Sequence, residues 1–481
     1  MGAAVTRVLE GTLGPADKAA SDYRLLPFTV PAGTTRIDVH YEYSQAMSAA
    51  DTTGQGNVLD IGLFDPRGGR FMGRGFRGWS GSARSSFFVS LPQATPGYLP
   101  GPIQAGKWRV LLGLYRIAAQ GCRYRVVVTL TRGEAGGAGG GRRMAAPPAP
   151  LSPAAPRWYR GDLHCHSHHS DASGSLADLA AAARSRGLDF LALTDHNTVS
   201  QNLQMAREAG PDLLLIPGEE ITTYYGHANL WGLREWVDFR CREAGTMNRI
   251  VARAHSQGAL FSVNHPKEGG PAWEYEGVTG FDCVEVWQGP WELSNHQSLA
   301  WWDGLLQQGR RVAAVGGSDK HQPPWPEQAS SHRLGNPTTW VYAERLSSAD
   351  VLRGIREGRA FISSDVDGPR LQLTAMVEGR PEASMGEVLT VSPGMSLSLG
   401  CRVQGARGDV LRLITGGQVQ GRAEVEAEDF SQEWILTVSS QSYFRAEVVQ
   451  ASEASGTNPA VAPSAPVLKA LTNPIYLRLK A

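Results

Sequence analysis

The sequence has few of the features that mark secreted, membrane-spanning or disulfide-linked proteins. Its 481 residues include five cysteines and no Cys-x-x-Cys pair: Cys122, Cys165, Cys241, Cys283 and Cys401. An odd number of scattered cysteines indicates reduced, buried thiols. No apolar run approaches the roughly 20 residues that a membrane span needs. Residues 1–6 lack the basic and apolar regions of a signal peptide. We therefore expect a cytoplasmic protein without a membrane span.

The chain also lacks an excess of charge of either sign. Lys plus Arg and Asp plus Glu both number 46, so the formal net charge is zero. Without a basic stripe or an aromatic-basic RNA motif, there is no reason to expect a nucleic-acid partner. A Gly-x-Ser-x-Gly nucleophile elbow is absent as well. These absences favour a small-molecule substrate and leave the oligomeric state open.

Composition divides the chain into blocks, and 481 residues are too many for one ordinary domain. Residues 1–133 contain short β-rich runs separated by Gly, Pro and Ser turns, which predicts an N-terminal β-sandwich-like domain. Residues 134–157 are rich in Gly, Ala and Pro, as in a linker. Beyond a central block, residues 366–481 return to β-like runs and predict a C-terminal β-domain.

The central block, residues 158–365, alternates strand-like and helix-like segments. Apolar runs such as 189–194 and 260–263 are typical of buried parallel strands. A helical pattern follows Ser175, the expected N-cap, and ends near Gly187, the expected C-cap. Alternation of this kind over about 200 residues predicts an α/β barrel or an open parallel sheet.

Polar residues stand where the predicted strands end. His164 and His166 are two residues apart, so on a strand they point to the same side while Cys165 packs on the other. Imidazole pairs with carboxylates suit Zn, Mn or Fe. More His, Asp and Glu residues follow later predicted strands: Asp195, His196, Glu219, Glu220, His227, His265, Asp319 and His321. Glu285 lies within a predicted strand. Because sites form at the carboxyl ends of strands, we expect one metal centre there.

At this point the central block resembles the PHP (polymerase and histidinol phosphatase) family of metal-dependent hydrolases. The motifs that carry the resemblance lie at 162–166, 170–171, 194–196, 217–220, 264–266 and 317–321. Residues 225–232, 368–369 and 470–476 are similar to the CehA/McbA-like branch, in which β-domains flank the PHP domain. The resemblance implies a distorted (β/α)7 barrel and two or three divalent metal ions, Zn, Mn or Fe.

The resemblance also implies a ligand set. His164, His166, Glu220 and Asp319 would hold the first ion, Glu220, His227 and His265 the second, and Asp171, His196 and His321 the third. Glu220 is preferred to Glu219 by its spacing from Gly218. Glu219 would then face away, as a surface carboxylate or a support for a ligand. Ala172 stands where some members have a histidine, so the third ion depends on Asp171.

Further roles follow for residues beside these motifs. Asp195 would orient a neighbouring ligand or move a proton, with orientation favoured. His321 would donate a proton to the leaving group if the third ion is absent. Lys267 and Lys320 either hold an anionic substrate or stay solvated at the rim. Trp287 and Trp291 are expected to line the pocket. His168 and His169 are expected at the cleft rim.

These residues predict a metal-dependent hydrolase. A phosphoesterase that uses a metal-activated water at a di- or trinuclear site is favoured, because paired cations suit phosphoryl oxygens. The alternatives are a carboxyl-ester or carbamate hydrolase of CehA/McbA type and a non-catalytic metal-binding PHP module. This order of preference rests on the family resemblance, because a fold alone does not fix a substrate.

Overall fold

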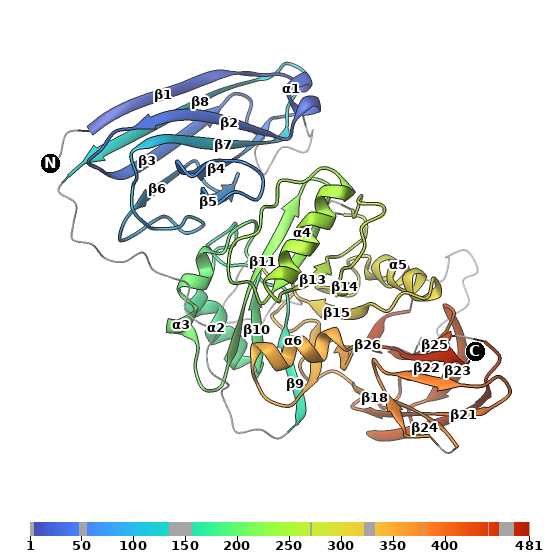
Figure 1. Ribbon diagram of the computed structural model, residues 1–481. Coiled ribbons are helices and arrows are strands. Elements are labelled where there is room, and N and C mark those ends of the chain that lie inside the picture. The colour runs from blue at the N-terminus through green and yellow to red at the C-terminus, as the bar shows by residue number, and fades with distance from the viewer. Residues whose placement is uncertain are drawn as a thin grey trace, which may run out of the picture.

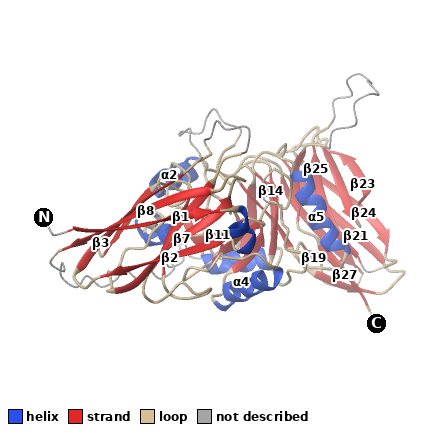
Figure 2. Cartoon of the chain, turned by 90° about the horizontal axis from the view of Figure 1, so that it is seen from above, coloured by secondary structure: helices blue, strands red, loops and turns tan. Residues whose placement is uncertain are grey.

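Three sheet-rich parts follow one another along the molecule (Figure 1). The computed structural model describes residues 4–47, 55–133, 156–269, 272–321, 332–378, 380–440, 442–451 and 466–480. The N-terminal and C-terminal sheets lie at opposite ends in both views, with most of the helices between them (Figure 2). The multidomain, sheet-rich organisation expected from the sequence is confirmed. The expected linker lies, up to residue 155, outside the described residues.

The N-terminal part consists of two four-stranded antiparallel sheets. The first has the order β1 (Ala4–Leu13), β8 (Cys122–Arg132), β3 (Thr34–Tyr43), β6 (Ser86–Ser90). The second has the order β2 (Tyr23–Val30), β7 (Gly106–Arg116), β4 (Val58–Phe64), β5 (Phe76–Gly81), and α1 (Pro15–Ala20) precedes β2. Ile37 and Val39 of the first sheet share one buried cluster with Ile61 and Trp108 of the second. The sheets therefore pack around a common apolar core.

The central part contains most of the helices and the strands that carry the predicted ligands. Its strands are β9 (Arg157–Asp162), β10 (Phe190–Leu193), β11 (Leu214–Thr223), β12 (Gly226–Trp231), β13 (Leu260–Val263), β14 (Cys283–Gln288), β15 (Ala313–Gly317), β16 (Thr338–Ala343) and β17 (Ala360–Ser363). Its helices are α2 (Leu176–Ser185), η1 (Ser200–Leu203), α3 (Met205–Glu208), α4 (Ala244–Ser256), α5 (Asn295–Gln307) and α6 (Ser348–Arg356).

The expected (β/α)7 barrel is not evident, and the chain is mostly β. The strands run parallel from β9 through β10 to β11 and from β13 through β14 to β15, but β12 is antiparallel to both its neighbours. The reason is local: the short turn at Tyr224 and Tyr225 joins β11 directly to β12, and so short a connection yields only an antiparallel pair. β16 is likewise antiparallel to β9 and β17.

Helix α2 shows how the local sequence builds this part. The Ser175 hydroxyl accepts a hydrogen bond from the Asp178 amide, while the Asp178 carboxylate accepts one from the Ser175 amide. This reciprocal cap begins the helix as predicted. Leu176, Leu179 and Ala183 face the core, and Gly187 follows the helix with a φ of +66°. No helix within the described segments is long and apolar enough to cross a membrane.

The C-terminal part continues the central sheet, because β17 pairs with β26. Its strands are β18 (Arg370–Val377), β19 (Ala383–Ser384), β20 (Val388–Val391), β21 (Ser396–Gln404), β22 (Val410–Thr415), β23 (Gln418–Glu424), β24 (Asp429–Thr437), β25 (Ser442–Val449), β26 (Leu468–Thr472) and β27 (Ile475–Leu479). A buried ion pair joins Arg445 of β25 to Asp303 of α5, with Nη2 and Oδ1 2.8 Å apart. Trp340 and Phe361 of the central part belong to its apolar core. The two parts are thus joined by one sheet and one core.

Candidate metal centre

His164 and His166 lie just after β9 and point toward the same carboxylates. The Nε2 atom of His164 lies 3.3 Å from Oε1 of Glu220 and 3.2 Å from Oδ1 of Asp319. The Nε2 atom of His166 lies 2.9 Å from the same Asp319 oxygen. Both imidazoles are fully buried. The structure therefore brings together all four residues expected around the first ion.

Glu220 stands in the middle of the cluster. Its Oε1 atom lies 3.4 Å from Nδ1 of His227 and 3.7 Å from Nε2 of His265. Its Oε2 atom lies 2.6 Å from Nδ1 of His196. Glu220 is on β11, His227 on the adjacent β12, and His265 follows β13, so three neighbouring strands converge on one carboxylate. This is the position that a bridging ligand requires.

A third group of donors lies nearer to solvent. Oδ1 of Asp171 lies 3.4 Å from Nε2 of His196 and 3.4 Å from Nε2 of His321. The His166 ring packs against both imidazoles, with centroids 4.2 Å from His196 and 4.0 Å from His321. His166, Asp171, His196 and His321 thus form one potential metal-binding group. His166, expected from the family resemblance to bind the first ion alone, therefore lies between two donor groups.

The buried donor atoms fit divalent cations. Nε2 of His164, both ring nitrogens of His166 and Oδ1 of Asp319 are buried and form no hydrogen bond with any described residue. Leaving a buried polar atom unpaired costs about 1–3 kcal/mol. Nε2 of His164 and Nε2 of His166 both lie beside Oδ1 of Asp319, so these three atoms suit a common partner. Imidazole nitrogens and carboxylate oxygens are the donors that Zn, Mn and Fe take.

The charges of the cluster agree with this fit. Burial opposes ionisation of Glu220, but His227, His164 and His196 outweigh it and hold the pKa of Glu220 well below its usual range. Burial also opposes ionisation of Asp319, but His164 and His321 outweigh it and hold the pKa of Asp319 well below its usual range. Ionised carboxylates of this kind are the form that binds a metal.

The histidines divide into two kinds. Burial lowers the pKa of His166 to about 3, which keeps its imidazole neutral. Burial also acts on His196, but Asp171 and Glu220 overcome it and raise the pKa of His196 to about 9. The carboxylates therefore attract positive charge to the His196 position, where a proton or a metal ion can supply it.

Supporting residues fix the ligands. Glu285 on β14 contacts Nδ1 of His164 at 2.8 Å, and Gln288 donates to Oδ2 of Asp319 at 2.8 Å. Asn264 donates to Glu220 Oε1 at 2.8 Å. Sequence reasoning noted Glu285 without giving it a role and missed Gln288 and Asn264. A carboxylate inside a strand with apolar neighbours was the signal for Glu285, since such a group needs a partner.

The backbone is strained at two predicted ligands. His265 and Asp319 have φ values of +28° and +51°, in the left-handed region that L residues rarely adopt. Such strain of about 1–3 kcal/mol concentrates at functional sites. Close packing adds a second constraint, because a Cβ on Gly317 would lie 2.4 Å from Cβ of His164. The His164 ligand thus requires a glycine at position 317.

Asp195 supports a loop and does not point into the cluster. Its oxygens accept hydrogen bonds from the Ser167 amide at 2.8 Å, the Ser167 hydroxyl at 2.9 Å and the Ser170 hydroxyl at 2.8 Å. These donors belong to the loop that carries Asp171. The contacts favour the orienting role for Asp195 over the proton-moving role.

The two predicted substrate lysines differ in their surroundings. Nζ of Lys267 donates to Oδ1 of Asn295 at 2.8 Å, and burial lowers the Lys267 pKa to about 8 although Glu285 and Asp319 oppose this. Lys320 Nζ donates to the His332 carbonyl at 2.6 Å and is 4% exposed. Lys267 therefore faces the carboxylates of the cluster, whereas Lys320 is directed toward a backbone carbonyl. Neither is a solvated rim charge.

Three further expectations need correction or refinement. Trp287 does not form an open pocket wall: it is 2% exposed, and its indole N–H donates to the Gly289 carbonyl at 3.1 Å. His169 is not at an open rim, because its side chain is buried and Nδ1 contacts the Ser200 hydroxyl at 2.8 Å. Glu219 does face away from the cluster, but it is fully buried rather than a surface residue. Trp291 is partly buried against Trp287.

Comparisons with known proteins find similarity to one family over part of the chain. The PHP domain model matches residues 162–235. One similar crystal structure is that of a two-domain protein from Bacteroides vulgatus, which contains a predicted PHP-like metal-dependent phosphoesterase. Its sequence is 18% identical to this one, the match covers 65% of this chain and 96% of that chain, and the TM-score is 0.37. A Bifidobacterium adolescentis protein assigned as a metal-dependent phosphoesterase is 15% identical over 40% and 94% of the two chains, with a TM-score of 0.26. No curated protein matches the chain. Residues 162–235 of the central part are thus similar to the PHP domain.

Proposed function

We propose that the protein is a metal-dependent hydrolase whose ions are held by the cluster around Glu220. The observation that carries the proposal is the set of buried donor atoms that meet there without a hydrogen bond among the described residues: Nε2 of His164, Nε2 of His166 and Oδ1 of Asp319. A structural polar network would satisfy these atoms with hydrogen bonds within the protein. Their convergence on shared carboxylates supports a site for more than one ion.

The proposed ligand sets follow the three donor groups. Asp319, Glu220 and His164 would hold one ion with His166, and Glu220 would bridge to a second ion completed by His227 and His265. Asp171, His196 and His321 would form a third position, where His166 also lies. Zn, Mn and Fe are the proposed metals. Ions bound in this way polarise a substrate oxygen and make a water more acidic, which is the chemistry that hydrolysis needs.

The exposure of the proposed ligands indicates the direction from which a substrate approaches. The side chain of Asp171 is 46% exposed and that of His321 25%, whereas His164 is fully buried. A small-molecule substrate would therefore enter on the side of Asp171 and His321. If the third position holds no ion, His321 would instead hold a proton for the leaving group on Nε2, because its Nδ1 contacts the Asp319 carbonyl at 2.9 Å.

A phosphoester is the favoured substrate class. The third donor group adds a cation position beside the first two, and several cations together stabilise the charge on phosphoryl oxygens. Lys267, whose Nζ donates to Oδ1 of Asn295, would add positive charge near Glu285 and Asp319, which act on its pKa.

A carboxyl ester or carbamate is the second candidate, through the likeness of residues 225–232 to the CehA/McbA-like branch. Two further proposals hold for either activity. The chain divides into domains at 1–133, 134–157, 158–365 and 366–481, and the protein is cytoplasmic.

One parallel assay separates these activities. The full chain is loaded with Mn or Zn and given p-nitrophenyl phosphate, bis-p-nitrophenyl phosphate, p-nitrophenyl acetate and an aryl carbamate. We expect turnover of a phosphate ester that a chelator abolishes and added metal restores. Faster cleavage of the acetate or the carbamate would overturn the phosphoesterase proposal. A metal-loaded chain that cleaves none of the four would overturn the hydrolase proposal.

A further inference from the structure

The β11–β12 hairpin carries two central ligands close to its tip. Glu220 lies on β11 and His227 on β12, and residues Tyr224 and Tyr225 form the turn between the strands. Thr223 pairs with Gly226 at the last step of the ladder. A displacement of this tip would therefore move both ligands.

The tip is held by the N-terminal sheets. The Tyr224 hydroxyl donates to Oδ2 of Asp60, a buried residue on β4, at 2.6 Å. The Tyr224 ring stacks on Tyr23 of β2 at a centroid distance of 5.9 Å and meets Tyr115 of β7 edge-on at 5.1 Å. Lys18 places its ammonium group 4.3 Å from the centre of the same ring. One side chain of the central part is thus enclosed by four elements of the N-terminal part.

Strand β7 has no side chain where Tyr224 enters. A Cβ on Gly113 would lie 2.4 Å from the Tyr224 hydroxyl oxygen and 3.0 Å from Cβ of Asp60. No real Cβ makes so close a contact, so the pairing of Tyr224 with Asp60 requires glycine at position 113. The N-terminal sheet is shaped for this tyrosine.

Neighbouring contacts hold the same segment. The Tyr225 hydroxyl donates to Oδ1 of Asp22 at 3.1 Å. Arg242 donates from Nε to the Tyr225 hydroxyl at 3.0 Å and from Nη1 to the Ala19 carbonyl at 2.8 Å. Both turn residues therefore bind the N-terminal part through their side chains.

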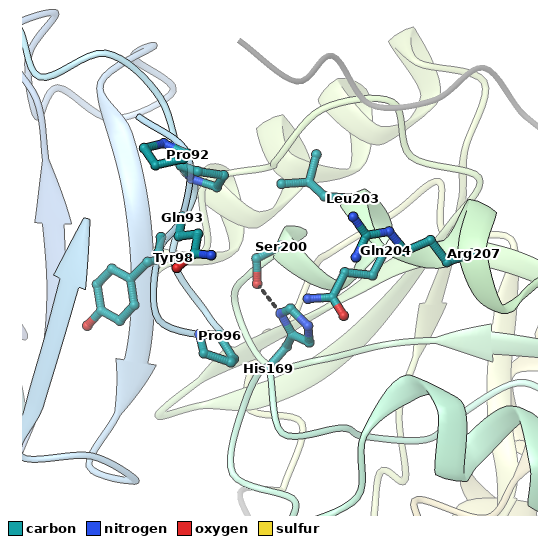
Figure 3. Close-up of a pocket in the computed structure, with 11 residues that line it drawn as sticks. Pro92, Gln93, Pro96, Tyr98, His169, Ser200, Leu203, Gln204 and Arg207 are labelled. Atoms are coloured by element: carbon teal, nitrogen blue, oxygen red, sulfur yellow. Dashed lines mark hydrogen bonds between the residues drawn. The ribbon is translucent and has the colours of Figure 1, made fainter. Parts of the chain in front are cut away.

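Two more ligand-bearing loops touch the N-terminal part (Figure 3). The Gly97 amide donates to the Ser200 hydroxyl at 3.0 Å, and the Thr198 hydroxyl donates to the Gly97 carbonyl at 3.0 Å. Ser200 in turn contacts His169, which follows the His166 loop, beside a cavity of about 330 Å³. The loops after β9 and β10 thus rest on the same body as the hairpin.

Thr222 connects the hairpin tip to the ligands. It is two residues from Tyr224, and its hydroxyl contacts Nδ1 of His196 at 2.6 Å and donates to Oε2 of Glu220 at 3.0 Å. A shift of the tip is transmitted to these two ligands through one side chain. One path from Asp60 to Glu220 thus runs through Tyr224 and the hairpin.

We propose that the N-terminal sheets position the metal-binding hairpin, and that Tyr224, through Asp60, is a positioning residue for Glu220 and His227. This inference rests on the proposed metal centre. It assigns to the N-terminal part a direct role in the geometry of the site. The ion shared by Glu220, His227 and His265 is the one whose binding depends on the contact.

Metal titration of the full-length Tyr224→Phe variant tests the proposal. Zn²⁺ affinity is measured against a competing chelator, and bound metal is counted by mass spectrometry. We expect about a tenfold weaker Kd for at least one ion, as for other residues that orient ligands. Tyr115→Phe is the matched control, because it removes an exposed hydroxyl from the same ring cluster and should leave every Kd unchanged. Equal affinities for Tyr224→Phe and the wild-type chain would overturn the proposal.

Two further variants separate positioning from a general loss of folding. Gly113→Ala keeps the Tyr224 hydroxyl but displaces it, and should weaken the same ion while the melting curve in chelator stays cooperative. Asp60→Ala should match Tyr224→Phe, and the double variant should be no weaker than either single one. Additive losses would overturn the path through Asp60. A wild-type chain that binds no Zn²⁺ would instead overturn the metal centre itself.

Discussion

The carboxylate of Glu285 lies 2.8 Å from Nδ1 of His164, with both side chains buried. A carboxylate at this nitrogen favours the proton on Nδ1 and leaves Nε2 free to bind. Nε2 points to Oε1 of Glu220 at 3.3 Å and to Oδ1 of Asp319 at 3.2 Å. Metal-bound histidines commonly carry a carboxylate in this place, which fixes the ring and raises its basicity.

Glu285→Gln should therefore weaken metal binding without unfolding the chain. The amide keeps the size of the side chain but loses the negative charge that stabilises the His164 ring. We expect the affinity for the ion at His164 to fall by about tenfold or more. Titration with Zn²⁺ in the presence of a chelator measures the change, and circular dichroism controls for folding. An unchanged affinity would show that Glu285 only fills space.

Asp195→Asn should separate a supporting role from a proton-moving role. Asparagine would replace one carboxylate oxygen with an NH₂ group, which cannot accept hydrogen bonds from Ser167 and Ser170. The variant should therefore lose about 1–3 kcal/mol of unfolding free energy. The pH dependence of kcat should keep its shape if Asp195 only holds the loop. Loss of one limb of the pH profile, at unchanged metal content, would restore the proton-moving role.

The Asp60–Tyr224 contact predicts a pH-dependent stability. Burial raises the pKa of Asp60 from its ordinary 3.8 to about 6, although the Tyr224 hydrogen bond opposes this. The folded state then holds a proton that the unfolded state has released, so the stabilisation is complete below about pH 4 and is lost as the pH rises through about 6. Chelator-treated wild type should lose up to about 3 kcal/mol relative to Asp60→Asn across this window.

Urea unfolding of both chains from pH 4 to pH 7 measures this difference. The comparison isolates Asp60, because every other titratable group is common to the two chains. Parallel pH curves for wild type and Asp60→Asn would contradict the raised pKa.

Lys267→Met tests whether this lysine binds substrate. If its ammonium group holds a phosphate ester, KM for p-nitrophenyl phosphate should rise about tenfold, while KM for an uncharged ester should change little. Lys320→Met is the matched control. Its Nζ binds the His332 carbonyl, so its loss should lower stability and leave KM unchanged. Equal KM changes for charged and uncharged esters would exclude a charge-based role for Lys267.

The gathering of His, Asp and Glu side chains at one edge of the sheet was predictable because its signal is local, whereas their assignment to ions came from the resemblance to the PHP family. Each of His164, Glu220 and Asp319 stands in or directly after a strand-like run, and strand ends of a parallel sheet meet in space. The sharing of His166 between two donor groups was not predictable, since it depends on ring packing against His196 and His321 rather than on spacing.

Other features depend on long-range geometry. Asp60 and Tyr224 are 164 residues apart, and neither lies in a recognisable motif. The regular barrel was expected because helices and strands alternate, yet the turn at Tyr224 and Tyr225 omits one helix and reverses a strand. Trp287 lies beside a strand end but faces the core, because sequence position does not give the side of a bulged strand.

A comparison of the metal content of Glu220→Gln with that of Glu219→Gln tests most directly the central claim, that Glu220 binds metal. The two glutamates are neighbours on β11, but only Glu220 contacts the ligands His196 and His227. Oε2 of Glu219 instead accepts a hydrogen bond from the Val237 amide at 3.0 Å, and burial raises the pKa of Glu219 well above its usual range. Both variants are purified after Zn²⁺ loading, and bound metal is counted by mass spectrometry. We predict that Glu220→Gln loses bound metal and activity together, while Glu219→Gln, which changes a side chain outside the cluster, keeps both. Full metal content in Glu220→Gln would contradict the account.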